Sequence, residues 1–207
     1  SIVNRVWAHH FGRGLCDTPN DFGRMGGVPS HPELLDWLAV WFRDDANGSL
    51  KQLHRLILLS STYQRQSQSS AAATVNSADL QNRLLWRMNR RHLDAESFRD
   101  AVIQVSGRID LTMGGPGIQQ FTKSTGSQLT PKLHYDKFDW QHPTAARRSI
   151  YRVVWRGIAD PFMESLDFPD LGLLAPKRDL SVSALQALAT FNNNFVLYHS
   201  QHLATQL

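Results

Sequence analysis

The sequence predicts a mainly α fold: an irregular helical domain with a long central loop and at most one or two short strands. Apolar residues recur at helical spacing in several segments, and capping boxes precede three of them, at Ser30, Ser49 and Ser183. By contrast, residues 112–146 lack a steady period and contain several glycines and prolines. A chain of 207 residues with 42% hydrophobic residues can bury a sizeable core around such helices.

The expected organisation has three parts. A helical block covers residues 1–110, an irregular connecting segment covers 111–146, and a second helical block over 147–207 packs on the first. Together they are expected to form one structural domain. Because the chain opens inside a helical pattern without an initiating Met, we expect it to be a piece of a longer protein.

The first block is expected to hold four or five helices. A helix over residues 2–11 ends at Gly12, and two more follow the capping boxes, the first of them ending at Asn47-Gly48. A fourth helix covers residues 80–88, and a fifth begins after Asp94 and ends near Gly107. Helical spacing predicts buried faces on the second and fifth helices, made by Leu34, Leu35, Leu38, Trp41 and Phe42 and by Phe98, Ala101, Val102 and Val105. The six tryptophans are mostly expected in the core.

The second block begins with residues 147–156, whose β-branched and aromatic content allows either a short strand or a helix. Its final helix is expected to start after Ser183, with Leu185, Leu188 and Ala189 facing inward. Three consecutive asparagines, residues 192–194, should break that helix before a closing helix or turn.

The sequence lacks the residues that several functional classes require. Cys16 is the only cysteine, which excludes an internal disulfide, a cysteine-based zinc site and a Cys-x-x-Cys-His haem attachment within the chain. The nine histidines form no His-Glu-x-x-His motif, so neither a metal site nor a cofactor is expected in this piece. A net charge of +4 does not call for nucleic acid, and no apolar run approaches the about 18 to 20 residues of a membrane span.

The charged residues have an unusual makeup, because 17 of the 22 basic residues are Arg and 15 of the 18 acidic residues are Asp. Arg and Asp form planar bidentate pairs, although a GC-rich coding bias would give much the same Arg excess. The acidic stretch 160–170 can therefore be a structural network with nearby arginines or the edge of a cleft. For the cleft, the catalytic candidates are Asp167, Asp170 and Glu164, and the binding candidates are Asp17, Asp21, Arg147, Arg148 and Arg178.

A set of short strings recurs together along nearly the whole chain. They include NRVWAHHFGRGL from Asn4, DTPNDFG from Asp17, SHPELLDWL from Ser30, NRLLWRMNRR from Asn82, TMGGPG from Thr112, RRSIYR from Arg147 and LQALA from Leu185. Taken together, these strings resemble the PSD1 family (DUF1553), which is abundant in planctomycetes. Asn194 stands before Phe195 where the family pattern suggests Pro, so the final helix break should be softer here.

The resemblance implies a large exported parent protein, with a periplasmic or extracellular setting. It also implies neighbouring domains of the DUF1549 and cytochrome c types, so haem c would belong to another domain of the parent. The family brings no assigned activity and no catalytic residues. The sequence leaves the oligomeric state open.

Three functional hypotheses follow. The leading one is a structural or interaction module that supports a neighbouring haem-bearing domain. The alternative is an enzyme domain, a polysaccharide- or sulfate-ester-related hydrolase or a redox enzyme, with an Asp/Arg-lined cleft. A third is electron transfer through docking of a cytochrome domain on the basic surface.

Overall fold

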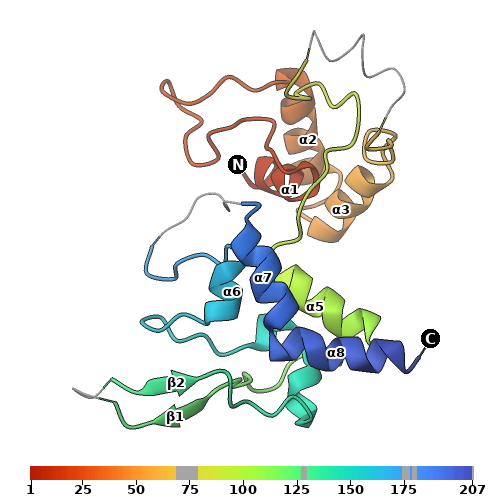
Figure 1. The fold of residues 1–207 in the computed structure, drawn as a ribbon. Helices are drawn as coiled ribbons and strands as arrows, with labels where there is room; N and C mark the ends of the chain where they lie inside the picture. Colours follow the sequence, from red (N-terminus) through yellow and green to blue (C-terminus); the bar gives the residue numbers. More distant parts are fainter. Residues whose placement is uncertain (69–78, 127–129, 174–177, 179–180, 207) are drawn as a thin grey trace. The chain divides into compact units, whose positions relative to one another are not determined.

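The structure, a computed structural model, describes residues 1–68, 79–126, 130–173, 178 and 181–206. Its internal contacts divide the chain into two compact units, Ser1–Arg91 and His92–Leu207. Seven α-helices and a single two-stranded sheet occur in the described part of the chain, so the prediction of a mainly α fold is confirmed (Figure 1). That the chain is one structural domain cut from a longer protein stays a prediction.

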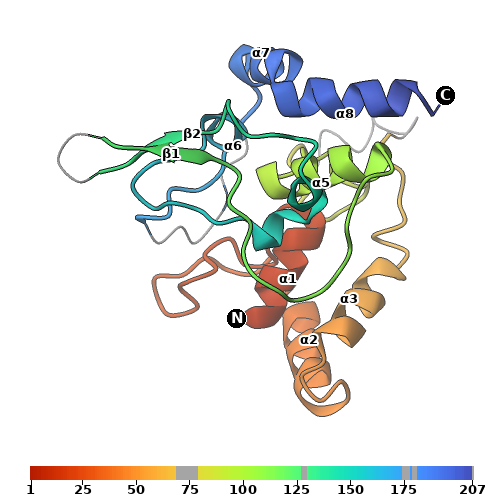
Figure 2. The same ribbon diagram turned by 90° about the horizontal axis from the view of Figure 1, so that it is seen from below.

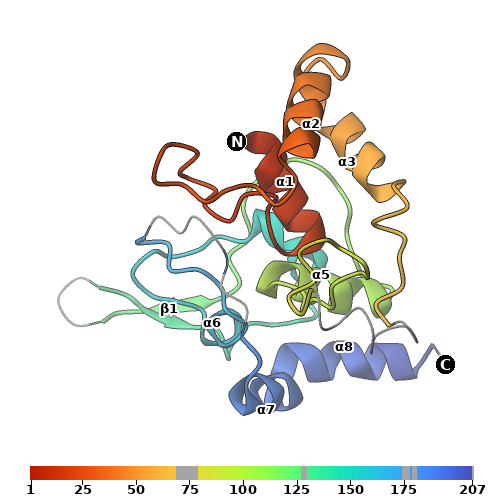
Figure 3. The ribbon, with the colours of Figure 1, turned by 90° about the horizontal axis from the view of Figure 1, so that it is seen from above.

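In the first unit, the described residues form three helices and the loops that follow them. They are α1 (Ile2–Phe11), α2 (Pro32–Asp44) and α3 (Leu50–Leu58), and α1 packs against the other two (Figure 3). Their apolar faces enclose a common core, formed by Val3, Val6, Trp7, Phe11, Leu15, Cys16, Leu35, Leu38, Leu53, Ile57 and Leu85. Of the face predicted for α2, Leu35 and Leu38 are buried and the other three residues pack partly buried against this core.

Some helix ends of this unit lie where the sequence predicts them, and others do not. Gly12 ends α1 in the left-handed conformation, with φ of 83°, as its lack of a Cβ predicts. Ser49 caps α3 by accepting a hydrogen bond from the amide of Gln52. The capping box predicted at Ser30 is wrong, because His31 is the N-cap of α2. The Ser30 hydroxyl donates to the carbonyl of Leu15 instead, which ties the preceding loop to the helix start.

The helix predicted over residues 80–88 is also wrong, because this segment forms turns. The carboxylate of Asp79 accepts hydrogen bonds from the amides of Arg83 and Leu84, at 2.8 and 2.7 Å. Asn82 and Leu85 take positive φ angles of 51° and 54°, which a right-handed helix does not allow. Short polar side chains have here captured the amides that a helix would use.

The second unit combines short helices with extended loops. Its elements are α5 (Ala95–Val105), β1 (Thr122–Ser124), β2 (Lys132–His134), α6 (Pro161–Ser165), α7 (Ala184–Asn192) and α8 (Asn194–Ala204). Two 3-10 turns, Pro143–Ala146 and Ser149–Tyr151, lie between β2 and α6. The strands pair antiparallel with Lys123 opposite Leu133, and α5 lies beside α8 (Figure 2).

Residues 147–156 contain parts of both predicted alternatives. The 3-10 turn Ser149–Tyr151 is the helical part, and two isolated bridges, Asp110 with Arg147 and Ile118 with Arg152, are the extended part. The connecting segment 111–146 holds both strands and the first 3-10 turn, and the rest of its described residues are irregular.

The inner faces of α5 and α7 differ from the prediction. On α5 the buried residues are Ala95, Arg99 and Ile103, whereas Val105 is 58% exposed. The face is rotated because a buried arginine occupies its centre. On α7 the capping box of Ser183 and Gln186 is confirmed, yet Leu185 and Leu188 are 66% and 58% exposed and no residue of the helix is buried.

The break between α7 and α8 lies where the sequence predicted it. The side chain of Asn193 caps α8 by accepting a hydrogen bond from the amide of Phe195. None of the helices in the described ranges is long and apolar enough to cross a bilayer.

His199 on α8 couples this unit to pH. Its side chain is 2% exposed, and its Nδ1 lies 2.7 Å from the hydroxyl of Ser106, which itself donates to the carbonyl of Ile103. The imidazole therefore donates from Nδ1 to the Ser106 hydroxyl, while its buried Nε2 has no hydrogen-bond partner among the described residues. Burial first, and then the charges of Arg108 and Arg99, lower the pKa of His199 to about 4.

We expect the stability of the chain to fall as the pH drops from 6.5 towards 4. The unfolded imidazole binds a proton near its ordinary pKa of 6.5, whereas the folded one resists protonation until the pH is near 4. The stabilisation is complete above pH 6.5, and about 3 kcal/mol is lost across this window. Urea unfolding at several pH values measures this loss. The free energy of unfolding should fall less steeply with decreasing pH for His199→Gln than for the parent chain. His142→Gln, at an exposed histidine, should show the same pH dependence as the parent chain.

Candidate functional site

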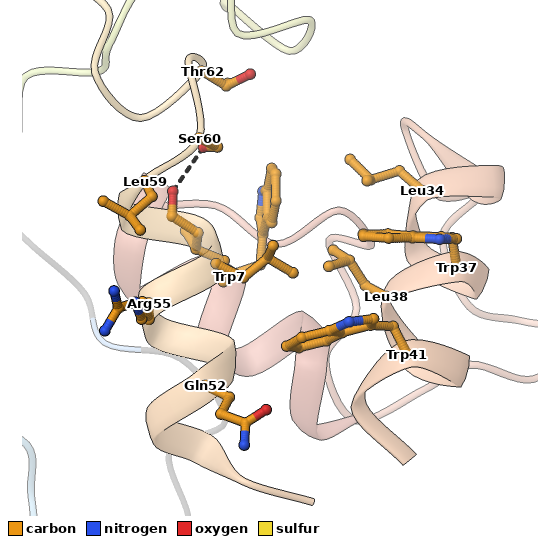
Figure 4. Close-up of a pocket in the computed structure, with 12 residues that line it drawn as sticks. Trp7, Leu34, Trp37, Leu38, Trp41, Gln52, Arg55, Leu59, Ser60 and Thr62 are labelled. Atoms are coloured by element: carbon orange, nitrogen blue, oxygen red, sulfur yellow. Dashed lines mark hydrogen bonds between the residues drawn. The ribbon is translucent and has the colours of Figure 1, made fainter. Parts of the chain in front are cut away.

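The candidate site is an apolar groove in the first unit, which we call the Trp groove. It has a volume of about 670 Å³ and is lined by residues of α1, α2, α3 and the turn after α3 (Figure 4). The lining residues are Trp7, Leu34, Trp37, Leu38, Trp41, Gln52, Arg55, Leu56, Ile57, Leu59, Ser60 and Thr62.

One wall of the Trp groove is an apolar stripe of α2. Leu34, Trp37, Leu38 and Trp41 follow helical spacing, so their side chains project from one side of the helix (Figure 4). The rings of Trp37 and Trp41 stack with centroids 6.4 Å apart and an interplanar angle of 22°. Leu38 is 2% exposed and belongs to the core, whereas Trp37 is 53% exposed. The stripe thus continues from the core into solvent.

The floor is held rigidly by α1. Trp7 is 7% exposed and stacks on Phe11 with ring centroids 4.3 Å apart. Such a packed aromatic pair keeps the base of the groove fixed before any ligand arrives.

The opposite wall comes from α3 and the turn after it. Leu56 and Ile57 supply its apolar part, and Leu59 is 63% exposed at the edge. Polar groups stand among these residues, namely Gln52, Arg55, Ser60 and Thr62. The hydroxyl of Ser60 donates to the carbonyl of Ile57 at 2.7 Å. A mostly apolar surface with a few polar groups is suited to binding rather than to acid–base chemistry.

The two acidic binding candidates of the first unit lie in the loop between α1 and α2. The exposed carboxylate of Asp17 forms a bidentate pair with Arg13, at 2.5 Å for each contact. Oδ1 of Asp21 accepts a hydrogen bond from the amide of Gly23 at 2.8 Å. Both carboxylates stabilise the local turn.

The three catalytic candidates lie in and after α6. Glu164 is exposed on the helix. Asp167 follows it with a positive φ of 59°, and its amide bonds to the carbonyl of Glu164, a left-handed helix end. Its carboxylate accepts hydrogen bonds from Ser181 and Gln186, and these bonds, led by that from the Ser181 amide, lower the pKa of Asp167. Asp170 accepts from the amide of Gly172.

The arginine candidates of the second unit also have partners. Arg147 donates to the carbonyls of Thr112, Gly114 and Pro116, and its guanidinium stacks 3.9 Å from the ring centroid of Tyr151. It thereby holds the Gly-rich loop 114–117 as a turn.

Arg148 and Arg178 pair with acids of α5. Arg178 forms two hydrogen bonds with the carboxylate of Glu96, at 3.0 and 2.7 Å, and this pairing raises the pKa of Arg178. Nε of Arg148 lies 3.7 Å from Oδ2 of Asp100. Within the predicted acidic stretch, Asp160 is the residue that pairs with an arginine, Arg152.

Arg148, Arg152 and Arg178 thus pair with acids, and of these acids Asp160 lies within residues 160–170. The structural network predicted for that stretch stays a prediction. The predicted cleft would combine residues of both units, and the catalytic and binding roles of its members stay predictions.

The Trp groove was not predicted from the sequence. The residue that could have indicated this groove is Trp37, which lies one turn before Trp41 and next to the predicted apolar face of α2. A stripe wider than the core needs, with a large aromatic residue at its edge, indicates a second contact surface.

Within the described ranges, no group of three or more His, Cys, Asp or Glu residues is arranged to hold a metal ion. His10 and His54 bond to each other at 2.7 Å, and burial is the main cause that lowers the pKa of His10.

The comparison with known proteins gives one result. No curated protein and no solved structure matches this chain. A family model described as "Protein of unknown function (DUF1553)" matches residues 1–207, the whole chain. The resemblance carried by the sequence strings is thereby confirmed, and the chain belongs to the PSD1 family.

Proposed function

We propose that this chain is an interaction module of a larger protein and that its Trp groove binds an amphipathic helix of a neighbouring domain. The observation that carries the proposal is the continuous apolar surface that leads from the core to Trp37, which is 53% exposed. Leaving an indole of this size in water forfeits the stabilisation that burial gives to aromatic side chains.

The shape of the groove favours a helix as the occupant. Two helices, α2 and α3, form its walls, and apolar anchors of a third helix at spacings of three and four residues would fill it. The polar rim of Gln52, Arg55 and Thr62 suits the charged flank of such a helix. Tryptophan among the apolar lining residues is typical of binding hot spots.

The identity of the neighbouring domain is proposed from the family. The family resemblance supports domains of the DUF1549 and cytochrome c types as partners, and an exported parent protein. In that setting the module would hold a haem-bearing domain in place without itself carrying the haem.

Binding in trans tests the proposal. The purified chain would be titrated calorimetrically with the separately produced remainder of the parent protein, and we expect saturable binding. Trp37→Ala and Leu59→Ser should each weaken it by about tenfold or more, because both remove apolar area at the groove. Leu84→Ser is the matched control, because Leu84 is 64% exposed but does not line the groove.

Two results would contradict the proposal. One is binding that Trp37→Ala and Leu59→Ser leave unchanged. The other is self-association of the chain, measured by light scattering, that Trp37→Ala abolishes, because a second copy would then be the occupant.

A further inference from the structure

We propose that a second cavity, in the unit His92–Leu207, binds a neutral sugar ring. Its volume is about 350 Å³, and its lining residues belong to this unit, whereas those of the Trp groove belong to the other. Gln120, Leu133, Tyr135, Asp136, Trp140, Asp160, Pro161, Phe162 and Asn192–Asn194 line it, and we call it the amide cavity.

The aromatic residues of the amide cavity are fixed by packing. The ring of Trp140 contacts Phe195, which is 1% exposed, with centroids 5.1 Å apart. The ring of Phe162 packs on that of Phe195 with centroids 6.1 Å apart. Tyr135 meets Phe121 edge-on with ring centroids 5.3 Å apart. Aromatic rings held in this way offer flat apolar faces to a ligand at little entropic cost.

Gln120 supplies a buried donor whose identity is determined by its partner. Its side chain is 3% exposed, and its Oε1 accepts a hydrogen bond from Nε of Arg152 at 2.9 Å. Because a guanidinium can only donate, the other terminal atom of Gln120 must be the NH2 group. This Nε2 has no hydrogen-bond partner among the described residues, which is costly for a buried amide. Gln120 lines the cavity, and a small shift of its buried amide would bring this donor to a ligand oxygen.

The acceptors of the cavity are carboxylate and amide oxygens. Asp160 pairs with Arg152, so its charge is neutralised, and its Oδ1 accepts from the amide of Phe162 at 3.0 Å. A carboxylate has more acceptor positions than these two bonds use. Asp136 and the exposed side chains of Asn192 and Asn194 stand at the same cavity.

These groups select the chemistry of the ligand. An anion is disfavoured, because Asp136 adds negative charge and Arg152, the cation bonded to Gln120, is already paired with Asp160. A purely apolar ligand would leave the amide and carboxylate groups desolvated without partners. A ring with an apolar face and several hydroxyl groups, each both donor and acceptor, satisfies the aromatic faces and the polar groups together. A neutral pyranose has this chemistry.

Ligand-detected NMR and calorimetry on the whole chain test the proposal. The probes are methyl glycosides of neutral hexoses and pentoses, oligosaccharides of the same sugars, and glucuronate as the anionic comparison. A single ring held by a few hydrogen bonds should bind with a Kd on the order of 1 mM. Tighter binding of an oligosaccharide than of its methyl glycoside would assign the site to a glycan rather than to a free sugar.

Matched variants assign the binding to this cavity. Gln120→Glu keeps the shape and the bond to Arg152 but removes the donor, so the affinity should fall by about tenfold or more. Asn192→Ala, at the surface, should weaken binding without any risk to the core. Gln119→Glu makes the same change at the neighbouring exposed residue, which does not line the cavity, and should bind like the parent chain.

Three outcomes would overturn the proposal. They are no binding of any neutral sugar at about 20 mM, binding of glucuronate as tight as that of the neutral sugars, and sugar binding that both Gln120→Glu and Asn192→Ala leave unchanged.

Discussion

Replacing Arg99 by Met should destabilise the chain by about 4 kcal/mol, because several buried acceptors lose their donor at once. Arg99 is 2% exposed, and its guanidinium donates to the carbonyls of Ala145 and Arg147 at 3.0 and 2.9 Å. It also lies 3.3 Å from the hydroxyl of Ser149 and 3.4 Å from Asp100. One side chain on α5 thereby organises the segment that holds both 3-10 turns.

The charge state of Arg99 supports this role. Burial first, and then the neighbouring charge of Arg152, lower the pKa of Arg99 to about 9, so the guanidinium is still protonated at neutral pH. A lysine would keep the charge but not the planar fork, so Arg99→Lys should lie between the parent and Arg99→Met in stability.

Urea unfolding monitored by circular dichroism measures the effect. Arg43→Met is the matched control, because Arg43 also pairs with the aspartate that follows it but its side chain is 73% exposed. The control should leave the unfolding midpoint unchanged. Equal midpoints for Arg99→Met and the parent chain would contradict the structural role of Arg99.

Replacing Asn4 by Ala should cost about 3 kcal/mol, because the backbone of Cys16 would lose both of its partners in a buried site. Asn4 is 0% exposed on α1. Its Nδ2 donates to the carbonyl of Cys16 and its Oδ1 accepts from the amide of Cys16, both at 2.9 Å. This side chain thus links the loop after α1 back to the helix.

The chain makes room for Asn4 at Gly14. A Cβ on Gly14 would lie 2.8 Å from both terminal atoms of Asn4, so only glycine allows this approach. Asn4→Asp should also be strongly destabilising at neutral pH, since a carboxylate oxygen would face the carbonyl of Cys16.

Asn20→Ala is the control for Asn4, because Asn20 is exposed and bonds to Arg5 on the same helix. Thermal unfolding should show a much lower midpoint for Asn4→Ala and little change for Asn20→Ala. If the two variants unfolded at the same temperature, the link between Asn4 and Cys16 would carry no stability.

Local rules recovered the elements whose determinants are close in sequence. Gly12 ends α1, Asp94 caps α5, and the pair Ser183 and Gln186 starts α7, since each of these contacts spans only a few residues. The same rules failed at residues 80–88, where Asp79 and Asn82 compete for the amides of a helix.

The buried faces of the helices were harder to predict from the sequence than the helices themselves. On α5 the inner stripe is centred on Arg99, and a pattern based on hydrophobicity cannot place a charged residue inside. What makes its burial possible is a set of carbonyls 46 to 48 residues away in sequence. On α7, Leu185 and Leu188 follow helical spacing but face solvent. Helical spacing shows that apolar residues share one side of a helix, but it does not show which element packs on that side.

The sequence by itself determined the family, the helical class and most helix ends, because these depend on residue types within a few positions of one another. Only the tertiary structure decided which side chains share a cavity. The Trp groove joins residues 7 and 62, and the amide cavity joins residues 120 and 194. Such contacts form when helices pack and loops close, so no local pattern records them.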